Sequence, residues 1–190
     1  MKYRLGNNGD ISWLLSQFSL FLATSFLLLS IAGFAFYNDW IKEAEIKNIA
    51  SNFASAIYGV DLNSFPSYQT FTFLDKNFSY QVSISTDYIR VIRNDGRIRK
   101  NIEVNKKLLI KIYPRCDNWD WKSGEELKKF IEEERYKDLG YSNPKDYLAE
   151  NLSKSIKFFS YEQMIIYPKE KVFIEKMEIY GEEYVLIYKR

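Results

Sequence analysis

The chain of 190 residues contains no histidine and a single cysteine, Cys116. Without histidine it lacks the side chain that most often serves as a general base and as a metal ligand. One cysteine excludes an internal disulfide, and no glycine-rich phosphate-binding motif is present. We therefore expect a protein that is not an enzyme and that holds no cofactor and no metal.

A strong excess of charge of one sign is also missing. The formal net charge is +2, and the basic residues form no cluster. Proteins that bind nucleic acid carry a basic patch that neutralises phosphates, so we expect no nucleic-acid partner. Behind the N-terminal apolar segment about 150 residues remain, which is enough for one domain with its own core.

The chain has no charged residue between Asp10 and Asp39. The apolar run from Ile11 to Asn38 has roughly 28 residues, whereas a helix crosses a bilayer core with about 20. Its serine and threonine side chains can bond back to a carbonyl one turn earlier. A cleaved secretory signal is the alternative, but its apolar region has only about 7–15 residues and no A-x-A-like site follows here. The run predicts a membrane span, with membrane lipid as its partner.

Aromatic residues mark both ends of this run, with Trp13 near one end and Tyr37 and Trp40 near the other. Such rings favour the headgroup level of a membrane. Lys2 and Arg4 precede the span, whereas the lysines that follow it are offset by acidic residues. Because positive charge favours the cytoplasmic side, we expect a single-pass protein of the cell membrane with a cytoplasmic N-terminus and an extracytoplasmic head.

The charged segment that follows keeps a helical rhythm of apolar residues without proline or glycine. Its members recur three and four residues apart, which indicates one buried stripe on an amphipathic helix. The stripe consists of Ile46, Ile49, Ala50, Phe53, Ala54 and Ile57. The helix is expected to end near Gly59, ahead of Pro66, and to pack its stripe on the apolar face of a sheet.

After Gly59 the apolar period changes from 3.6 to 2, most clearly in "FSYQVSIS". Alternation of this kind predicts strands with one apolar face. Asn94-Asp95-Gly96 supplies the residues of a tight hairpin turn. We expect one antiparallel meander made of strands at residues 68–74, 78–85, 87–93, 97–104 and 108–114.

The remaining segment predicts two helices and a terminal hairpin. Ser123 as N-cap and Glu126 as its capping-box partner begin a helix that is expected to end near Gly140. Asn143 and Pro144 begin a second helix that continues to about residue 158. The hairpin covers residues 171–189, with its turn at Gly181-Glu182.

The fold class is therefore α+β. A long N-terminal membrane-spanning helix continues into an amphipathic helix that packs on an antiparallel β-sheet, with a C-terminal helical and hairpin extension. The expected divisions are a leader at residues 1–9, the helix at 10–58 and an extracytoplasmic head at 59–190.

Two further motifs remain. Asn77-Phe78-Ser79 and Asn151-Leu152-Ser153 fit the N-glycosylation pattern, which makes Asn77 and Asn151 the acceptors. "DNWDW" at residues 117–121 is rich in oxygen ligands, but its spacing does not match a calcium-binding EF-hand loop. The alternative is a loop whose tryptophans anchor it on the domain or form a contact surface.

These features together resemble the archaeal type IV pilin-like proteins that carry class III signal peptides. The leader would be "MKYRLGNNG", basic at Lys2 and Arg4 and ending in Gly9, with processing between Gly9 and Asp10. Ser12 matches the serine of the family's start, and "IKNIASNFASAI" and "YQVSISTDYIRV" are similar to the end of the helix and the early strands of such proteins. The resemblance covers roughly residues 1 to 110.

The sequence departs from the family in two places, with Asp10 where Gln is usual and Leu14 where a Glu is usual. In the family that Glu pairs with the terminal amine of a neighbouring subunit. The resemblance implies a non-catalytic, structural or interaction role in a surface filament or its assembly, as a minor pilin, with other pilin-like subunits as partners. The alternative is a stand-alone, membrane-anchored domain that binds an envelope component.

Overall fold

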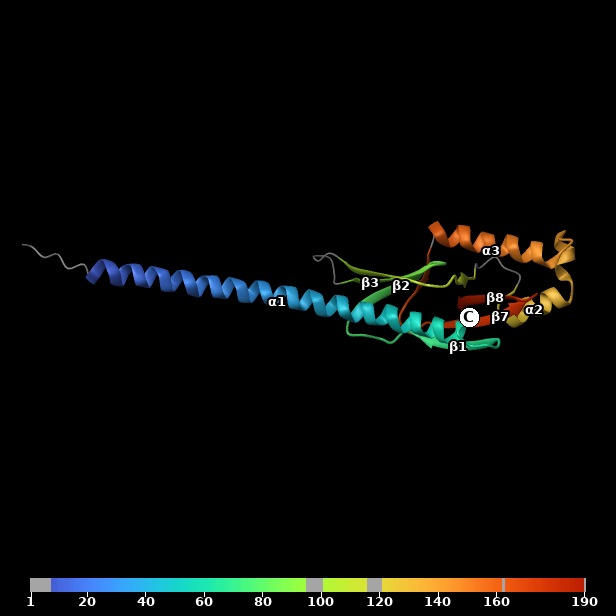
Figure 1. Ribbon diagram of the computed structural model, residues 1–190, viewed down its shortest axis with the longest axis horizontal. Helices are drawn as coiled ribbons and strands as arrows, with labels where there is room; N and C mark the ends of the chain where they lie inside the picture. Colours follow the sequence, from blue (N-terminus) through green and yellow to red (C-terminus); the bar gives the residue numbers. More distant parts are fainter. Residues whose placement is uncertain (1–7, 95–100, 116–120, 162, 190) are drawn as a thin grey trace, which may run out of the picture. The chain divides into compact units, whose positions relative to one another are not determined.

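The computed structural model describes residues 8–94, 101–115, 121–161 and 163–189, and side chains except those of 8–10 and 153–162. The fold is α+β, as the sequence predicts: one long helix, two four-stranded sheets and a group of shorter helices (Figure 1). The helices are α1 (Asn8–Asp61), α2 (Gly124–Glu132), the 3₁₀ helix η1 (Arg135–Leu139) and α3 (Pro144–Tyr161).

The eight strands form two separate sheets. The strands are β1 (Ser67–Thr72), β2 (Ser79–Ile84), β3 (Tyr88–Asn94), β4 (Ile102–Lys107), β5 (Tyr113–Pro114), β6 (Met164–Ile166), β7 (Lys171–Ile179) and β8 (Glu182–Lys189). The first sheet has the order β1-β7-β8-β5 and the second the order β4-β3-β2-β6. All pairs are antiparallel except β5 with β8.

Compact packing divides the chain inside α1, into Met1–Lys42 and Glu43–Arg190. The amphipathic part of α1 therefore packs with the head, whereas the boundaries expected from the sequence group it with the span. This larger unit, Glu43–Arg190, is called the head below.

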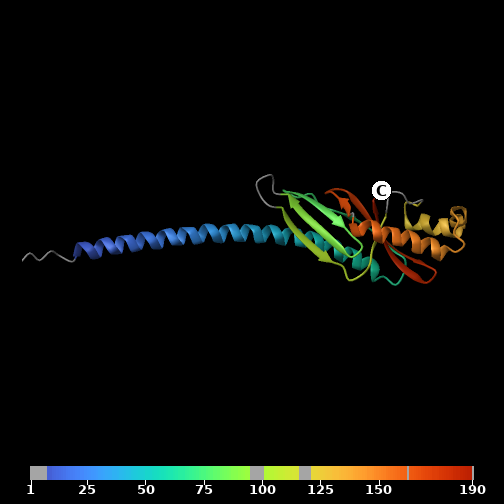
Figure 2. The ribbon, with the colours of Figure 1, turned by 90° about the horizontal axis from the view of Figure 1, so that it is seen from above.

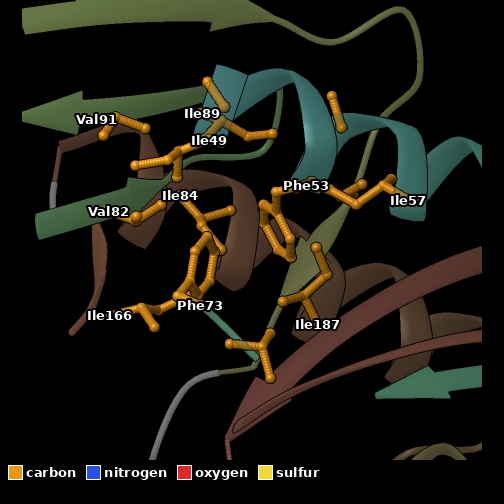
Figure 3. Close-up of a cluster of buried hydrophobic side chains, with 14 of the residues drawn as sticks. Ile49, Phe53, Ile57, Phe73, Val82, Ile84, Ile89, Val91, Ile166 and Ile187 are labelled. Carbon is orange, nitrogen blue, oxygen red and sulfur yellow. The ribbon is translucent and has the colours of Figure 1, made fainter. Parts of the chain in front are cut away.

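The predicted stripe of α1 lies in the centre of the head. Ile46, Ala50, Phe53 and Ile57 have no exposed surface, and Ile49 is 9% exposed. They share one core with residues of both sheets, which Figure 3 shows around Phe53. The ring of Phe53 contacts the rings of Phe71 and Phe73, with centroids 5.0 Å away in each case. The spacing of apolar residues in the sequence thus identifies the face that is buried.

One ion pair joins the polar side of the same helix to the second sheet. The guanidinium of Arg93 on β3 lies 2.6 Å from Oε2 of Glu45 and 3.8 Å above the ring centre of Phe78. Because the Arg93 side chain is only 11% exposed, this contact is shielded from solvent on the arginine side. Figure 2 shows the green strands of this sheet lying across the second half of α1.

The sheet that contains β7 and β8 is covered on both faces. Val172, Ile174, Val185 and Ile187 point to the core around Phe53, while their neighbours join a second core. That second core, formed with α2, η1 and α3, contains Trp121, Leu127, Phe130, Ile131, Tyr136, Tyr147, Leu148, Met177, Ile179, Leu186 and Tyr188. The terminal hairpin therefore contributes side chains to both cores of the head.

The prediction of one five-stranded meander is wrong. Of the five predicted strands, only β2, β3 and β4 pair with one another in chain order. The first predicted strand, β1, pairs instead with β7, with Phe71 opposite Val172. Six residues separate β1 from β2, too many for a tight hairpin and enough to reach the other sheet. The turn residues Asp95 and Gly96 lie outside the described residues.

The fifth predicted strand is reduced to Tyr113–Pro114, which pairs in parallel with β8. The segment before it bonds to the β2–β3 loop, where the Leu108 amide donates to the Asp87 carbonyl and the Ile112 amide to that of Thr86. These bonds take the backbone groups that a sheet ladder would need.

The predicted helix at residues 123–140 is interrupted. Its start is correct, because the Ser123 hydroxyl accepts a hydrogen bond from the Glu126 amide at 3.2 Å. It ends at Glu132, and Glu134 adopts a left-handed conformation with φ 56° before η1 begins. Three consecutive glutamates, residues 132–134, oppose the negative end of the helix dipole, which explains the early end. Asn143 begins the next helix as predicted, since its Oδ1 accepts from the Lys145 amide.

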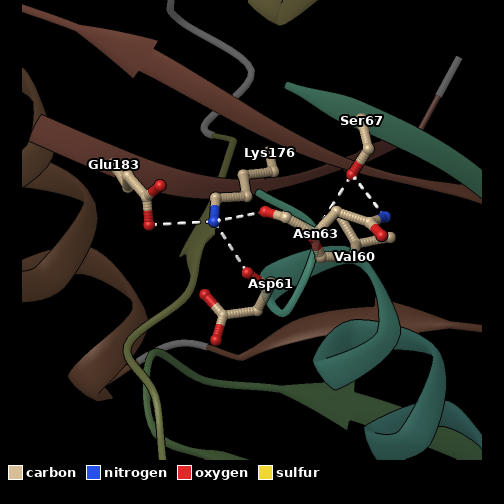
Figure 4. A network of polar contacts seen from close by, with 6 residues as sticks. All are labelled: Val60, Asp61, Asn63, Ser67, Lys176 and Glu183. Atoms are coloured by element: carbon tan, nitrogen blue, oxygen red, sulfur yellow. Dashed lines mark hydrogen bonds and ion pairs between the residues drawn. The ribbon is translucent and has the colours of Figure 1, made fainter. Parts of the chain in front are cut away.

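A buried lysine holds the C-terminal end of α1. Nζ of Lys176 donates to the carbonyls of Asp61 at 2.7 Å and Asn63 at 2.8 Å, and lies 2.9 Å from Oε2 of Glu183 (Figure 4). A cation is favourable there because the last carbonyls of a helix lack partners and carry partial negative charge. Lys176 therefore fixes the end of α1 to the β7–β8 hairpin.

We predict that Phe53→Ala lowers the free energy of unfolding by about 3–5 kcal/mol, because it opens a cavity beside the rings of Phe71 and Phe73. Denaturant unfolding of the full chain in detergent, followed by near-ultraviolet circular dichroism, measures this loss. Ser55→Ala, at an exposed position on the same helix, is the control and should change stability by less than about 0.5 kcal/mol. Equal effects of the two variants would contradict the buried stripe.

We also predict that Lys176→Met lowers the free energy of unfolding by about 2–3 kcal/mol, because two carbonyls and a carboxylate lose a charged donor. The same denaturant titration applies. Lys171→Met removes an exposed lysine from the first position of the same strand and should have little effect. A Lys176 variant as stable as the Lys171 variant would show that the lysine is not what holds the end of α1.

Candidate functional site

The N-terminal part of α1 exposes an unusually apolar surface. Between residues 11 and 40 the large hydrophobic side chains are 42–77% exposed, and none of the most apolar window is buried. Among the described residues, α1 is the one helix long and apolar enough to cross a membrane. Soluble domains rarely expose continuous apolar surface of this size, so the segment needs an apolar environment.

Three hydroxyl side chains of this segment bond to carbonyls within the helix. The Ser16 hydroxyl donates to the Ser12 carbonyl at 2.9 Å, and the Ser30 hydroxyl donates to the Phe26 carbonyl at 2.8 Å. Thr24 bonds in the same way to the carbonyls of Leu20 and Phe21. In lipid, where no water can compensate, such bonds remove the cost of burying a hydroxyl.

Aromatic rings lie at both ends of the apolar segment. Trp13 is 62% exposed, and Tyr37 and Trp40 stack with ring centroids 6.3 Å apart. Along a helix, the 27 residues from Trp13 to Trp40 correspond to about 40 Å. This length matches a bilayer with its interfacial layers, about 40–45 Å thick.

The expected processing position falls at the beginning of the described chain. Residues 1–7, with most of the expected leader, lie outside the described residues. α1 begins at Asn8, so the backbone of Gly9 and Asp10 is helical. Leu14, where the sequence departs from the pilin-like pattern, is 58% exposed and offers no charge.

The two expected glycosylation acceptors have different surroundings. Asn77 is exposed in the turn before β2. Asn151 is half-buried within α3, and its Nδ2 already donates to the Tyr147 carbonyl at 2.8 Å. Only the Asn77 amide is therefore open to modification in the folded head.

The tryptophan loop is described only at its end. Cys116 and residues 117–120, the oxygen-rich part of this loop that the calcium-binding alternative concerns, lie outside the described residues. Trp121 is 1% exposed in the second core, and its carbonyl accepts a hydrogen bond from Nε of Arg115 at 2.8 Å. Within the described ranges no group of three or more His, Cys, Asp or Glu side chains could hold a metal.

The head also contains a cleft of about 310 Å³ that the sequence does not reveal. Residues from α3, β5 and the β7–β8 hairpin line it, so its members lie far apart in the chain. They are Tyr113, Lys145, Leu148, Ala149, Leu152, Ile179, Tyr180, Glu182 and Tyr184. The turn of this hairpin is Tyr180-Gly181, one residue earlier than the predicted Gly181-Glu182, because Ile179 pairs with Glu182. It places a bulky residue where a two-residue hairpin turn normally has Asn or Asp.

A carboxylate and two phenols are coupled in this cleft. The Tyr184 hydroxyl donates to Oε2 of Glu182 at 2.6 Å, and the rings of Tyr113 and Tyr184 meet edge to face at 5.7 Å. Burial raises the pKa of Tyr184, and the hydrogen bond to Glu182 and its charge raise it further. Burial and the charge of Glu182 also raise the pKa of Tyr113. Both phenols therefore stay protonated and act as donors at neutral pH.

Comparison of the chain with protein-family models, with curated proteins and with solved structures finds no match.

Proposed function

We propose that this chain is a non-catalytic, single-pass membrane protein of the archaeal type IV pilin-like kind, with a structural or interaction role in a surface filament or its assembly. The observation that supports this best is that the two parts of α1 have different surroundings. Its second part buries a stripe in the core of the head, while residues 11–40 expose apolar side chains.

The exposed segment is suited to lipid and to contact with other apolar helices alike. It is uncharged between Asp10 and Asp39, and the hydroxyls of Ser16, Thr24 and Ser30 are bonded within the helix. A segment of this kind can leave the bilayer and enter a helical filament with these three hydroxyls still bonded within the helix, because both surroundings are apolar.

A second proposal is a stand-alone anchored domain that never polymerises. Leu14 favours it, because an exposed leucine cannot pair with the terminal amine of a neighbouring subunit. Packing of apolar helices would then have to set the register of a filament without that charge pair. The two proposals share the anchor and differ in whether the leader is removed.

We predict that the mature protein begins at Asp10, because a peptidase that acts where a basic leader meets the apolar helix requires a small residue there, and Gly9 has no side chain. Intact-mass spectrometry of the protein from its native membrane measures the first residue. Gly9→Val should retain the leader, and the matched variant Gly6→Ala should be processed as usual. A native protein that begins at Met1 or Lys2 would leave only the stand-alone anchored domain.

We propose that the N-terminus is cytoplasmic and the head extracytoplasmic, because Lys2 and Arg4 precede the span. Lys47, exposed on α1 beyond the span, provides a probe. With Cys116→Ser as background, Lys47→Cys should react with a membrane-impermeant thiol reagent in intact cells stripped of their outer envelope. Asp10→Cys, at a position that remains whether or not the leader is removed, is the control and should react only after lysis. The reverse pattern would invert the orientation.

A further inference from the structure

Tyr180, at the rim of the cleft, has a position that neither the turn nor the core explains. It has φ 53°, and Gly181 after it has φ 79°, so both turn residues are left-handed. Asn or Asp followed by Gly suits such a turn, whereas a bulky aromatic residue is disfavoured there. The ring is also 54% exposed, so it contributes little to the core. A tyrosine held at this position provides an aromatic surface that faces solvent.

The other walls of the cleft are aromatic or aliphatic. Tyr113 and Tyr184, which line the cleft with Tyr180, are half-buried, and Leu148 on α3 is 4% exposed. A volume of about 310 Å³ lies at the lower end of the range of about 300–1,000 Å³ that small-molecule sites occupy. The space therefore suits a ligand of one or two rings with an apolar surface.

Two charged groups of opposite sign complete the lining. Glu182 is fixed by the Tyr184 hydroxyl on Oε2, and its other oxygen has no protein partner in the described part of the head. Lys145, on the first turn of α3, makes no ion pair with any described side chain. The carboxylate only accepts hydrogen bonds and the ammonium only donates them.

This combination selects against charged ligands. A cation that stacks on the tyrosines and meets Glu182 would also meet the ammonium of Lys145, and an anion drawn to Lys145 would meet the carboxylate. A purely apolar ligand would remove water from Glu182 without replacing it. A neutral sugar ring meets each requirement, because its C–H faces pack on aromatic rings and each hydroxyl both donates and accepts.

We propose that this cleft binds a neutral saccharide unit, stacked on Tyr180 and hydrogen-bonded to Glu182 and Lys145. The inference is independent of the proposed anchoring role, because every residue involved belongs to the head. Processing at Gly9 and saccharide binding can therefore succeed or fail separately.

The test uses the full chain in phospholipid nanodiscs, which contain no sugar detergent. The probes are methyl glycosides of glucose, mannose, galactose and N-acetylglucosamine at millimolar concentration, and saturation-transfer difference NMR measures binding. Tetramethylammonium and acetate serve as charged probes of similar or smaller size. We expect saturation transfer to at least one glycoside and none to either ion.

Tyr180→Asn separates binding from folding, because asparagine suits the turn better than tyrosine does. This variant should keep or raise the melting temperature, while the dissociation constant of the bound glycoside rises about fivefold on loss of one aromatic wall. Glu182→Gln should also weaken binding. Glu178→Gln, at an exposed position on β7 outside the cleft, is the matched control and should bind as the parent does.

Competition by soluble glucan and mannan then identifies the source of the sugar. Loss of the glycoside signal on addition of polymer indicates a unit within a polysaccharide, and an unchanged signal indicates a free sugar; either supports the cleft as a saccharide site. Three results would overturn the proposal: no transfer to any glycoside, transfer to an ion instead, or unchanged glycoside binding in both Tyr180→Asn and Glu182→Gln.

Discussion

The stripe on the second part of α1 is the constraint on which the head depends. Phe53 and its neighbours fill the space between two sheets that share no hydrogen-bonded strand pair. Each sheet would otherwise expose an apolar face, and a helix of this amphipathic kind covers both at once. The burial of Phe73, the packing of Phe71 on Phe53, and the contact of Arg93 with Glu45 all depend on where this helix lies.

Polar contacts then fix what apolar packing leaves free. An apolar stripe defines which side of a helix is buried, but hydrophobic contact is not directional and allows sliding along the axis. Lys176 bonds to carbonyls at a single point, the last turn of α1, and so sets the axial position. Glu175, the adjacent residue on β7, faces the other way and accepts a hydrogen bond from the Gly124 amide at the start of α2. One strand thus positions a helix on each face of its sheet.

Local patterns in the sequence predict the elements that depend on neighbouring residues. The apolar spacing around Phe53 predicts the buried stripe, and Ser123 and Asn143 predict the starts of two helices. The sequence does not predict that the strands divide into two sheets. β1 pairs with β7, about a hundred residues later, and no local pattern specifies that partner. The run "YVLIY" does carry a signal, since continuous apolar residues are typical of a strand buried on both faces.

The candidate sites divide in the same way. A span is predicted from composition alone, because membrane crossing depends on one continuous segment. The saccharide cleft is not predicted from the sequence, because Tyr113, Lys145 and Glu182 come from three segments that only the tertiary fold brings together. The glycosylation motifs show the converse limit: Asn77 and Asn151 look alike in sequence, and only the structure shows that Asn151 is half-buried and bonded to the Tyr147 carbonyl.

The unbroken helical backbone of α1 has a mechanical consequence. A force along the axis of its second part would shear the stripe against the two sheets. The side chains packed around Phe53 would then resist the displacement of the helix together and not one after another. The bonds from Lys176 lie at the end of the helix opposite the span, so the load reaches them last. Slippage of the helix along its axis would therefore have to break the contacts around Phe53 together.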